Sequence, residues 1–419
     1  MARARPVGSA FFPLDEQLGL LASGMTPRAE ETLVRLASWM SFADAQQLLH
    51  DLLGVRVSTG TARRATLATG TAQLSVCEQQ EERLKQALPP APAGAEKQAM
   101  SADGAFVHVV AGEWVEVKSL TLAEVTRNKR GEVSLKQVSS FSRLLDAERF
   151  TQAALVETHR RGLEQASEVC AVQDGAVWLQ GLVDYHRADA VRILDFPHAA
   201  EYVNAIGQAV QAAGGHLPAQ WLEGVLHRLK HQGPARVLQH LAFLAARYPS
   251  PEMQELLSYL QKREVHMQYP TYQAAGWPIG SGSVESANKR VVEARLKGAG
   301  MRWQGSNVNP MLVLRNAVCN RDWQPTWTSA QAHRRALRRH ERQDDSQQRL
   351  NRACWTLAYW SVRLTQLAQP SVSTGPVPAV QASLERPVPR LGVGYSWRKP
   401  FLRRLPSSSG ASPGTCAKK

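Results

Sequence analysis

Residues 169–203 read VCAVQDGAVWLQGLVDYHRADAVRILDFPHAAEYV, and this stretch decides the fold. The apolar runs at 169–172 and 191–194 are short enough for buried strands, whereas residues 176–185 between them have helical spacing. A further helix follows His198. Strands that alternate with helices along a chain are typical of parallel pairing in an α/β sheet. The stretch therefore predicts the parallel part of such a sheet.

The segment that precedes this stretch is rich in β-branched and aromatic residues. It holds three short runs, at 106–110, 114–117 and 120–125, with Gly112 between the first two. This arrangement is typical of antiparallel strands. Residues 144–167 return to helical spacing. We therefore expect the order β-β-β-α-β-α-β, in a mixed sheet whose first strands are antiparallel.

Capping residues mark the helices near the N-terminus. Thr26, Ser41 and Ser58 each precede a helical pattern and can accept a hydrogen bond from a free backbone N–H group. The third of these helices carries Arg63 and Arg64. A helix, a short turn and an arginine-bearing helix form a helix-turn-helix unit, whose second helix enters the major groove of DNA. Plain packing in a small helical bundle is the alternative.

Changes of composition divide the chain into segments. Pro89 to Gly94 breaks the helical pattern, residues 200–268 are almost wholly helical, and the part from about Pro370 is rich in Pro, Ser and Gly. We expect the following order: an N-terminal arm (1–25), a helix-turn-helix-like domain (26–88), a linker (89–98), the α/β core (99–199), a helical insertion (200–275), a C-terminal helix of the core (276–325), a basic helical region (326–369) and a basic tail (370–419).

The charge balance of the chain favours a polyanionic partner. Among 419 residues, Lys and Arg number 50 and Asp and Glu number 36, so the net charge is +14. Such an excess favours nucleic acid, with a merely basic protein as the alternative. No apolar run has the roughly 18–20 residues of a membrane helix. Met1 to Ala10 has no apolar core of a signal peptide, so we expect a cytoplasmic protein.

Three acidic residues stand where strands or helices of the predicted sheet begin or end. Asp103 lies at the start of the first strand, Asp174 directly after the fourth, and Glu285 at the start of a late helix. Three converging carboxylates repel one another, and Mg²⁺ ions, which prefer oxygen ligands, relieve that repulsion. Two such ions promote in-line phosphoryl transfer. Taken singly, each of the two Asp-Gly pairs has an alternative interpretation as a turn. Glu285 alone has an alternative interpretation as an acid that the helix dipole favours in a first turn.

Asp195 is a fourth acid, at the end of the fifth predicted strand, and His198 follows it. Two interpretations are open: both residues assist the site, or Asp195 is the N-cap of the next helix. The sequence contains no GxxxxGK[ST] motif for ATP. Its five cysteines are scattered, and the histidines of the helical segment lack the pairing of zinc ligands.

Several of these blocks resemble the bacterial insertion-sequence transposases of the Kra group, which are DDE transposases with a ribonuclease-H-like core. The resemblance rests on SADGAFVHV (101–109), on VQDGAVWLQGLVDYHRADAVRILDFPHAAEYV (172–203) and, most specifically, on GWPIGSGSVESANKRVVEARLKGAGMRW (276–303). PLDEQLGL (13–20) and YSWRKPF (395–401) are also similar to the family. The resemblance therefore spans nearly the whole chain.

The resemblance implies a fold, a site and a reaction. The fold is an α/β ribonuclease-H-like mixed sheet with an all-helical insertion, preceded by a helix-turn-helix domain. Asp103, Asp174 and Glu285 would be the catalytic and metal-binding residues, holding two Mg²⁺ or Mn²⁺ ions, and Asp195 and His198 match an accompanying segment. The enzyme would cut DNA at the ends of an insertion sequence and join those ends to target DNA.

The resemblance also implies the partners. They are double-stranded DNA, both as terminal inverted repeats and as target, and further copies of the chain in a homo-oligomer on DNA at the bacterial nucleoid. Neither ATP nor a membrane is expected as a partner. The expected DNA contacts are Arg63, Arg64, Arg290, Arg295, Lys297, Arg302, Arg334, Arg335, Arg338 and Arg339. For those just after Glu285 a solvated helix face is the alternative, and Trp303 either stacks on a base or packs inside the protein. Two other functions remain open: a DNA-binding protein without catalysis, and a metal-dependent nuclease without strand transfer.

Overall fold

The computed structural model describes residues 25–367 of the chain. These residues belong to two units, one that extends to Arg349 and one that begins at Leu350. The expected basic tail, the PLDEQLGL and YSWRKPF segments and all but the last residue of the expected arm lie outside the described residues. Each unit is therefore considered by itself.

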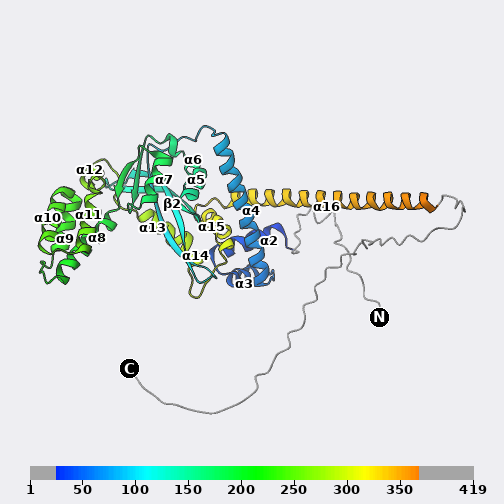
Figure 1. The fold of residues 1–419 in the computed structure, drawn as a ribbon, viewed down its shortest axis with the longest axis horizontal. Helices are drawn as coiled ribbons and strands as arrows, with labels where there is room; N and C mark the ends of the chain where they lie inside the picture. Colours follow the sequence, from blue (N-terminus) through cyan, green and yellow to red (C-terminus); the bar gives the residue numbers. More distant parts are fainter. Residues whose placement is uncertain (1–24, 368–419) are drawn as a thin grey trace, which may run out of the picture. The chain divides into compact units, whose positions relative to one another are not determined.

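A five-stranded sheet forms the centre of the first unit (Figure 1). Its strands are β1 (Lys97–His108), β2 (Trp114–Arg127), β3 (Val133–Arg143), β4 (Glu168–Gln173) and β5 (Val191–Leu194). They lie in the order β3-β2-β1-β4-β5. β1 pairs with β4, and β4 with β5, in parallel, whereas the β1–β2 and β2–β3 pairs are antiparallel. The expectation of a mixed α/β sheet with an antiparallel start is confirmed.

The prediction that residues 114–117 and 120–125 are two separate strands is wrong. Residues 114–117 and 120–125 form one strand, β2, because the ladder with β1 continues through Lys118 and Ser119. The third antiparallel strand is β3, which the pattern of the sequence did not identify. Its buried half is polar, and Ser142 shares an Oγ–Oγ hydrogen bond with Ser119 at 2.8 Å. A strand with buried serines lacks the apolar alternation by which strands are recognised.

Helices cover both faces of the sheet. One face carries α5 (Ala147–Ala153) and α7 (Val177–Arg187), with α6 (Leu155–Arg160) and the short η1 (Leu163–Gln165) between them. The other face carries α13 (Gly282–Ala287), the π-helical turn η3 (Asn288–Glu293), α14 (Ala294–Leu296) and α15 (Gly305–Cys319). Leu120 of β2 belongs to the first core and Val117 to the second. Alternate residues of one strand thus build two separate cores.

The N-terminal helices are α2 (Pro27–Trp39), α3 (Phe42–Leu53) and α4 (Thr59–Gln86). The predicted caps are confirmed, since Thr26, Ser41 and Ser58 each accept a hydrogen bond from a backbone N–H group in the following turn. Val34 of α2 packs with Leu314 of α15. These helices therefore share a hydrophobic core with the helices that cover the sheet.

The chain between β5 and α13 is helical. Its elements are α8 (Phe196–Ala212), α9 (Trp221–Gln232), α10 (Pro234–Arg247), α11 (Pro251–Gln261), η2 (Glu264–Met267) and α12 (Tyr269–Ala274). Two cations of the sheet hold its last turn: Arg127 Nη2 donates to Ala274 O at 3.1 Å, and Lys97 Nζ donates to Ala275 O at 3.0 Å. Cations are favourable at the carbonyl end of a helix. The helical segment is thus anchored to β1 and β2.

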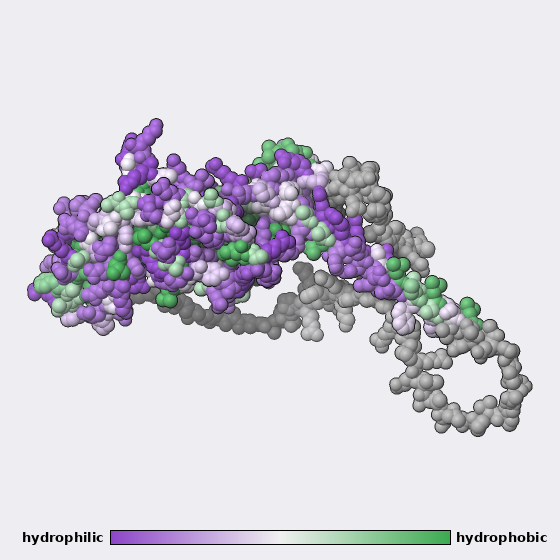
Figure 2. Space-filling view, turned by 90° about the horizontal axis from the view of Figure 1, so that it is seen from above, coloured by the Kyte–Doolittle hydropathy of each residue, from purple (hydrophilic) through white to green (hydrophobic). Residues whose placement is uncertain are grey.

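The last described element is a single helix, α16 (Trp323–Leu367). The boundary expected between residues 325 and 326 therefore falls inside a helix. Its final turns, which belong to the second unit, expose Leu350, Trp355 and Leu357. Figure 2 shows hydrophobic residues there, on a molecule whose visible face is otherwise largely hydrophilic. No helix among the described residues is long and apolar enough to cross a membrane.

Candidate active site

The strand register aligns three aspartates at one end of the sheet. β1 pairs Met100 with Ala171 of β4, and the same register continued for three residues sets Asp103 level with Asp174. β4 pairs Gln173 with Leu194 of β5, so the next residues, Asp174 and Asp195, are level as well. Neighbouring strands lie about 4.8 Å apart. Aspartates that are distant in sequence therefore stand side by side at the carboxyl ends of β4 and β5.

Asp103 lies in the middle of β1, opposite Ser119, and not at the start of a strand as expected. Its Oδ1 accepts from Gly104 N at 2.7 Å, and its Oδ2 accepts from Asn288 Nδ2 at 2.9 Å. Burial raises the pKa of Asp103, and the negative charges of Asp174 and Glu285 raise it further. Asp174 and Glu285 are therefore each close enough to Asp103 to act on it electrostatically.

The Asp103–Gly104 pair is not a turn, because both residues continue the β1–β2 ladder. Gly104 instead makes room for a side chain of β2: a Cβ at this position would lie 2.2 Å from Glu116 Oε1. The turn interpretation does apply to Asp174 and Gly175, since Gly175 has a φ of +82° directly after β4. The two Asp-Gly pairs therefore differ in backbone conformation although both lie beside the candidate site.

Side chains from α11 and the residues after it hold the Asp174 loop. The hydroxyl of Tyr259 donates to Asp174 O, and Arg263 Nη2 donates to Gly175 O at 2.8 Å. The guanidinium of Arg263 lies over the Tyr259 ring, 3.7 Å from its centroid. Asp174 Oδ1 in turn accepts from Ala176 N at 2.9 Å. Sequence reasoning missed Tyr259 and Arg263, because nothing in their own segment indicates a partner 85 or 88 residues away.

Glu285 lies in the first turn of α13, as expected, and its side chain is exposed. α13 is held against the sheet by Ser283, whose Oγ is 3.0 Å from Thr121 Oγ1 of β2. Asn288 follows Glu285 by three residues, at the start of the π-helical turn. Residues with this spacing share one side of a helix. α13 and η3 therefore present one carboxylate and one amide beside Asp103.

Asp195 is a buried helix cap, which confirms the second of the two interpretations for this residue. Its Oδ2 accepts from His198 N at 3.1 Å, at the start of α8. Its Oδ1 accepts from Ser281 N at 2.7 Å, so it also holds the residues that lead into α13. The His198 ring contacts the rings of Tyr202 and Tyr259 edge-on. Asp195 thus positions the backbone on two sides of the candidate site.

The donor chemistry of the site suits a hard cation. Its oxygens are those of three carboxylates and of the Asn288 amide, whose buried Oδ1 has no partner among the described residues. Oxygen ligands of this kind are those that Mg²⁺ prefers. Within residues 25–367, however, no three His, Cys, Asp or Glu side chains are placed closely enough to hold a metal ion together. The acids interact, but they do not form a closed ligand cluster.

Two of the arginines expected to contact DNA are used inside the protein. Arg295 is 2% exposed and donates from Nε to Ala37 O at 2.9 Å; burial lowers its pKa to about 10. Arg334 forms an ion pair with buried Glu30 at 3.1 Å. The expectation for Arg295 is wrong, because a buried guanidinium that satisfies a buried acceptor is not available to phosphates. Arg334 keeps partial exposure, and its contact with DNA stays a prediction. Trp303 is also buried, which confirms its interpretation as a packing residue.

The other expected contacts remain accessible. Arg63, Arg64, Arg290, Lys297, Arg302, Arg335 and Arg339 are exposed, and Arg338 is partly buried. The loop that carries Lys297 and Arg302 lies beside the end of β1, because Trp303 N donates to His108 O at 3.0 Å and Val110 N donates to Trp303 O at 2.9 Å. The loop that carries Lys297 and Arg302 is therefore hydrogen-bonded to the end of β1, the strand that contains Asp103.

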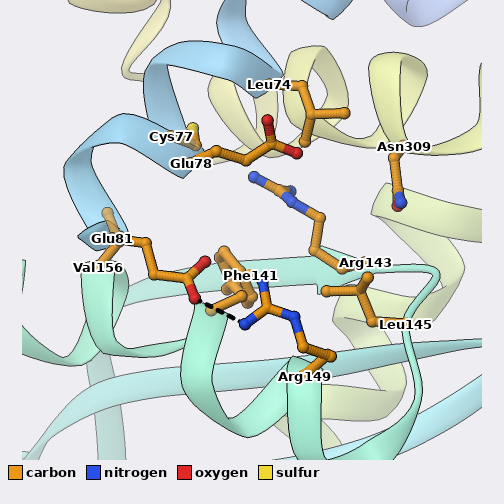
Figure 3. A pocket seen from close by; sticks show the side chains of 11 residues that line it. Leu74, Cys77, Glu78, Glu81, Phe141, Arg143, Leu145, Arg149, Val156 and Asn309 are labelled. Carbon is orange, nitrogen blue, oxygen red and sulfur yellow. Dashed lines mark hydrogen bonds and ion pairs between the residues drawn. The ribbon is translucent and has the colours of Figure 1, made fainter. Parts of the chain in front are cut away.

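A separate cavity lies between α4, the end of β3 and α5, and it contains none of the predicted site residues (Figure 3). Arg143 lies buried against it, with its guanidinium directed toward Glu78. Arg149 pairs with Glu81 at the same cavity, Nη1 to Oε1, at 3.1 Å. Burial lowers the pKa of Arg143, and nearby groups, among them Glu78, oppose that effect. The cavity thus lies where α4 meets the end of β3.

No protein-family model matches this chain, and no curated protein matches it significantly. The class of this protein is therefore defined by its fold and its candidate site alone. The chain is an α/β protein with a five-stranded mixed sheet and interacting acidic residues beside the ends of its parallel strands.

Proposed function

We propose that the chain is a metal-dependent DNA transposase of the DDE type, as its resemblance to the Kra group implies. The observation that carries the proposal is the placement of three acids: Asp103 lies in β1, Asp174 follows its parallel neighbour β4, and Glu285 lies on α13. The charges of Asp174 and Glu285 both act on Asp103. The sheet order β3-β2-β1-β4-β5 and its pairing are compatible with the ribonuclease-H-like core of such enzymes. The helical segment before Glu285 is compatible with their helical insertion.

Asp103, Asp174 and Glu285 would hold the Mg²⁺ or Mn²⁺ ions. Bound there, divalent ions relieve the repulsion between carboxylates, activate an attacking oxygen and stabilise the leaving oxygen. The protein's own part is to fix the acids. Asp103 is held by Gly104 and Asn288, and the Asp174 loop is held from the helical segment. Burial raises the pKa of Asp103, and the charges of Asp174 and Glu285 raise it further; a cation would relieve that repulsion.

The net charge of +14 and the exposed cations support DNA as the substrate. Arg63 and Arg64 are exposed near the start of α4, the last helix of the candidate helix-turn-helix unit, where they would contact terminal inverted repeats. Lys297 and Arg302, on the loop at the end of β1, would bind phosphates of the same DNA. Two DNA ends must be held together for strand transfer, so we propose a homo-oligomer on DNA, associated with the bacterial nucleoid and independent of ATP.

The test is cleavage of a supercoiled plasmid that carries the DNA flanking this gene, with Mg²⁺ or Mn²⁺ and the full chain. We expect cuts at the element ends and joined products, both lost with EDTA and in Asp174→Asn. Asp189→Asn is the matched control, since Asp189 is a surface residue whose side chain is 71% exposed. Cutting without joining would make the protein a nuclease. Specific end binding without cutting would make it a DNA-binding protein without catalysis.

A further inference from the structure

Asn288 contacts the candidate active site directly, although it is not one of the predicted acids. It is 6% exposed and lies at the first position of the π-helical turn η3. Its Nδ2 donates to Asp103 Oδ2 at 2.9 Å, across 185 residues of sequence. Together with the Gly104 N–H group, this contact gives each oxygen of the Asp103 carboxylate one protein donor. The orientation of the carboxylate is therefore set by the protein.

The other end of the amide is unsatisfied. Asn288 Oδ1 is buried and accepts no hydrogen bond from the described residues. Buried polar atoms in proteins nearly always have a partner, and an exception calls for a specific explanation. The amide lies against the Asp103 carboxylate, so its oxygen is a suitable ligand for a cation there, or an acceptor for a water of the cation's hydration shell. Because the amide is neutral, it adds an oxygen to the site without adding a further negative charge to the repulsion at Asp103.

The backbone around Asn288 is built to keep it in place. The turn η3 is π-helical, a conformation that occurs mostly as single turns and frequently at functional sites. The carbonyl groups of Arg290 and Val291 within it accept hydrogen bonds from the buried guanidinium of Arg315, with Nε 3.1 Å from Val291 O. Arg315 is 1% exposed. A buried side chain therefore supports the irregular turn that follows Glu285 and Asn288.

We propose that Asn288 is a positioning residue of the metal site: its Nδ2 fixes Asp103, and its Oδ1 is a neutral oxygen available to the same cation. This inference rests on the proposed function. It adds to the site a neutral amide, which lies beside the predicted acids.

The test measures Mn²⁺ binding to the full chain by electron paramagnetic resonance, without DNA and without turnover. The variants are Asn288→Ala and Asn288→Leu, of which the second keeps the number and branching of the side-chain heavy atoms. Asn320→Ala is the matched control, because the Asn320 amide likewise hydrogen-bonds to a strand of the sheet, at Ser140 N and O at 2.8 Å each, away from the acids. Thermal unfolding is recorded for every variant. Asp174→Asn tests whether the bound Mn²⁺ occupies the proposed site.

We expect both Asn288 variants to weaken Mn²⁺ binding at least about tenfold, as the loss of residues that orient metal ligands commonly does. Asn320→Ala should lower thermal stability without changing Mn²⁺ affinity. Affinity within about twofold of the wild type in both Asn288 variants would overturn the inference and leave Asn288 a structural residue. If the wild type shows no saturable Mn²⁺ binding, or if Asp174→Asn does not weaken that binding, the proposed metal site itself is overturned. The two failures are therefore distinguishable.

Discussion

Arg315 Nη1 donates a hydrogen bond to Ser38 O at 2.7 Å and so joins α15 to the end of α2, across 277 residues of sequence. The same guanidinium donates to Val291 O and Arg290 O in the turn that follows Glu285. The carbonyl end of a helix favours a cation, and Arg315 supplies it from inside the protein. The candidate DNA-reading helices and the segment with a candidate catalytic acid therefore share one buried hydrogen-bond network.

Arg315→Met should destabilise the protein strongly. Methionine keeps much of the apolar volume, but the carbonyl groups of Ser38 and Val291 lose a buried donor, and that of Arg290 loses a part-buried one. Each unpaired buried polar group costs about 1–3 kcal/mol, so we expect the free energy of unfolding in urea to fall by about 3 kcal/mol or more. Arg28→Met is the control, because the Arg28 side chain is 81% exposed. Equal stability of the two variants would contradict the structural role of Arg315.

Tyr259→Phe should reduce DNA cleavage more than it reduces stability. The variant removes the hydroxyl that donates to Asp174 O, and with it one restraint on the loop of a candidate catalytic acid. We expect cleavage to slow by about tenfold or more, with end binding unchanged in gel-shift titrations. Tyr272→Phe is the matched control, since the Tyr272 hydroxyl donates to Val265 O at 2.8 Å, away from the acids. Equal cleavage rates in both variants would refute the role of Tyr259.

His186 should make the stability of the fold depend on pH. Its Nε2 is 2.9 Å from Thr151 O, and its Nδ1 is 3.2 Å from Thr158 Oγ1. Burial lowers the pKa of His186 from 6.5 to about 4. The unfolded chain therefore binds more protons than the folded chain between these values. The stabilisation is complete above about pH 6.5 and is lost as the pH falls toward 4, by up to about 3 kcal/mol.

Urea titrations of the wild type and of His186→Leu at about pH 5 and pH 7.5 check this dependence. The wild type should lose more stability on acidification than His186→Leu does. His227→Leu is the control, because His227 is exposed on α9. An acid-induced loss that is the same in all three proteins would show that His186 is not its source.

Two glycines should respond oppositely to alanine. A Cβ at Gly70 of α4 would lie 2.2 Å from Pro310 O of α15, so Gly70→Ala must force the two helices apart, at a cost of about 1–3 kcal/mol. A Cβ at Gly224 of α9 would meet nothing within 4 Å, and Gly224→Ala should stabilise by about 0.5–1 kcal/mol through helix propensity. Thermal unfolding measures both. Stabilisation by Gly70→Ala would contradict the close approach of α4 and α15.

The local elements could be predicted from the sequence because their causes are local. The caps at Ser41 and Ser58 and the strand at 191–194 depend on residues a few positions apart. β3 could not be found in this way. Its buried half is rich in serine, and Ser142 pairs with Ser119 of another strand. Polar residues that pair across strands leave no apolar pattern in their own segment.

The sequence by itself determined the parallel part of the sheet, the capped N-terminal helices and the three candidate acids, because residue type and periodicity are written along the chain. Only the tertiary structure decided which side chains meet. The β1–β4 register sets Asp103 level with Asp174, and the π-helical turn brings Asn288 to Asp103. It also assigned Arg295 to the interior, where sequence reasoning expected a DNA contact. A sequence states the charge of a guanidinium, but packing decides whether that charge meets a carbonyl group or the solvent.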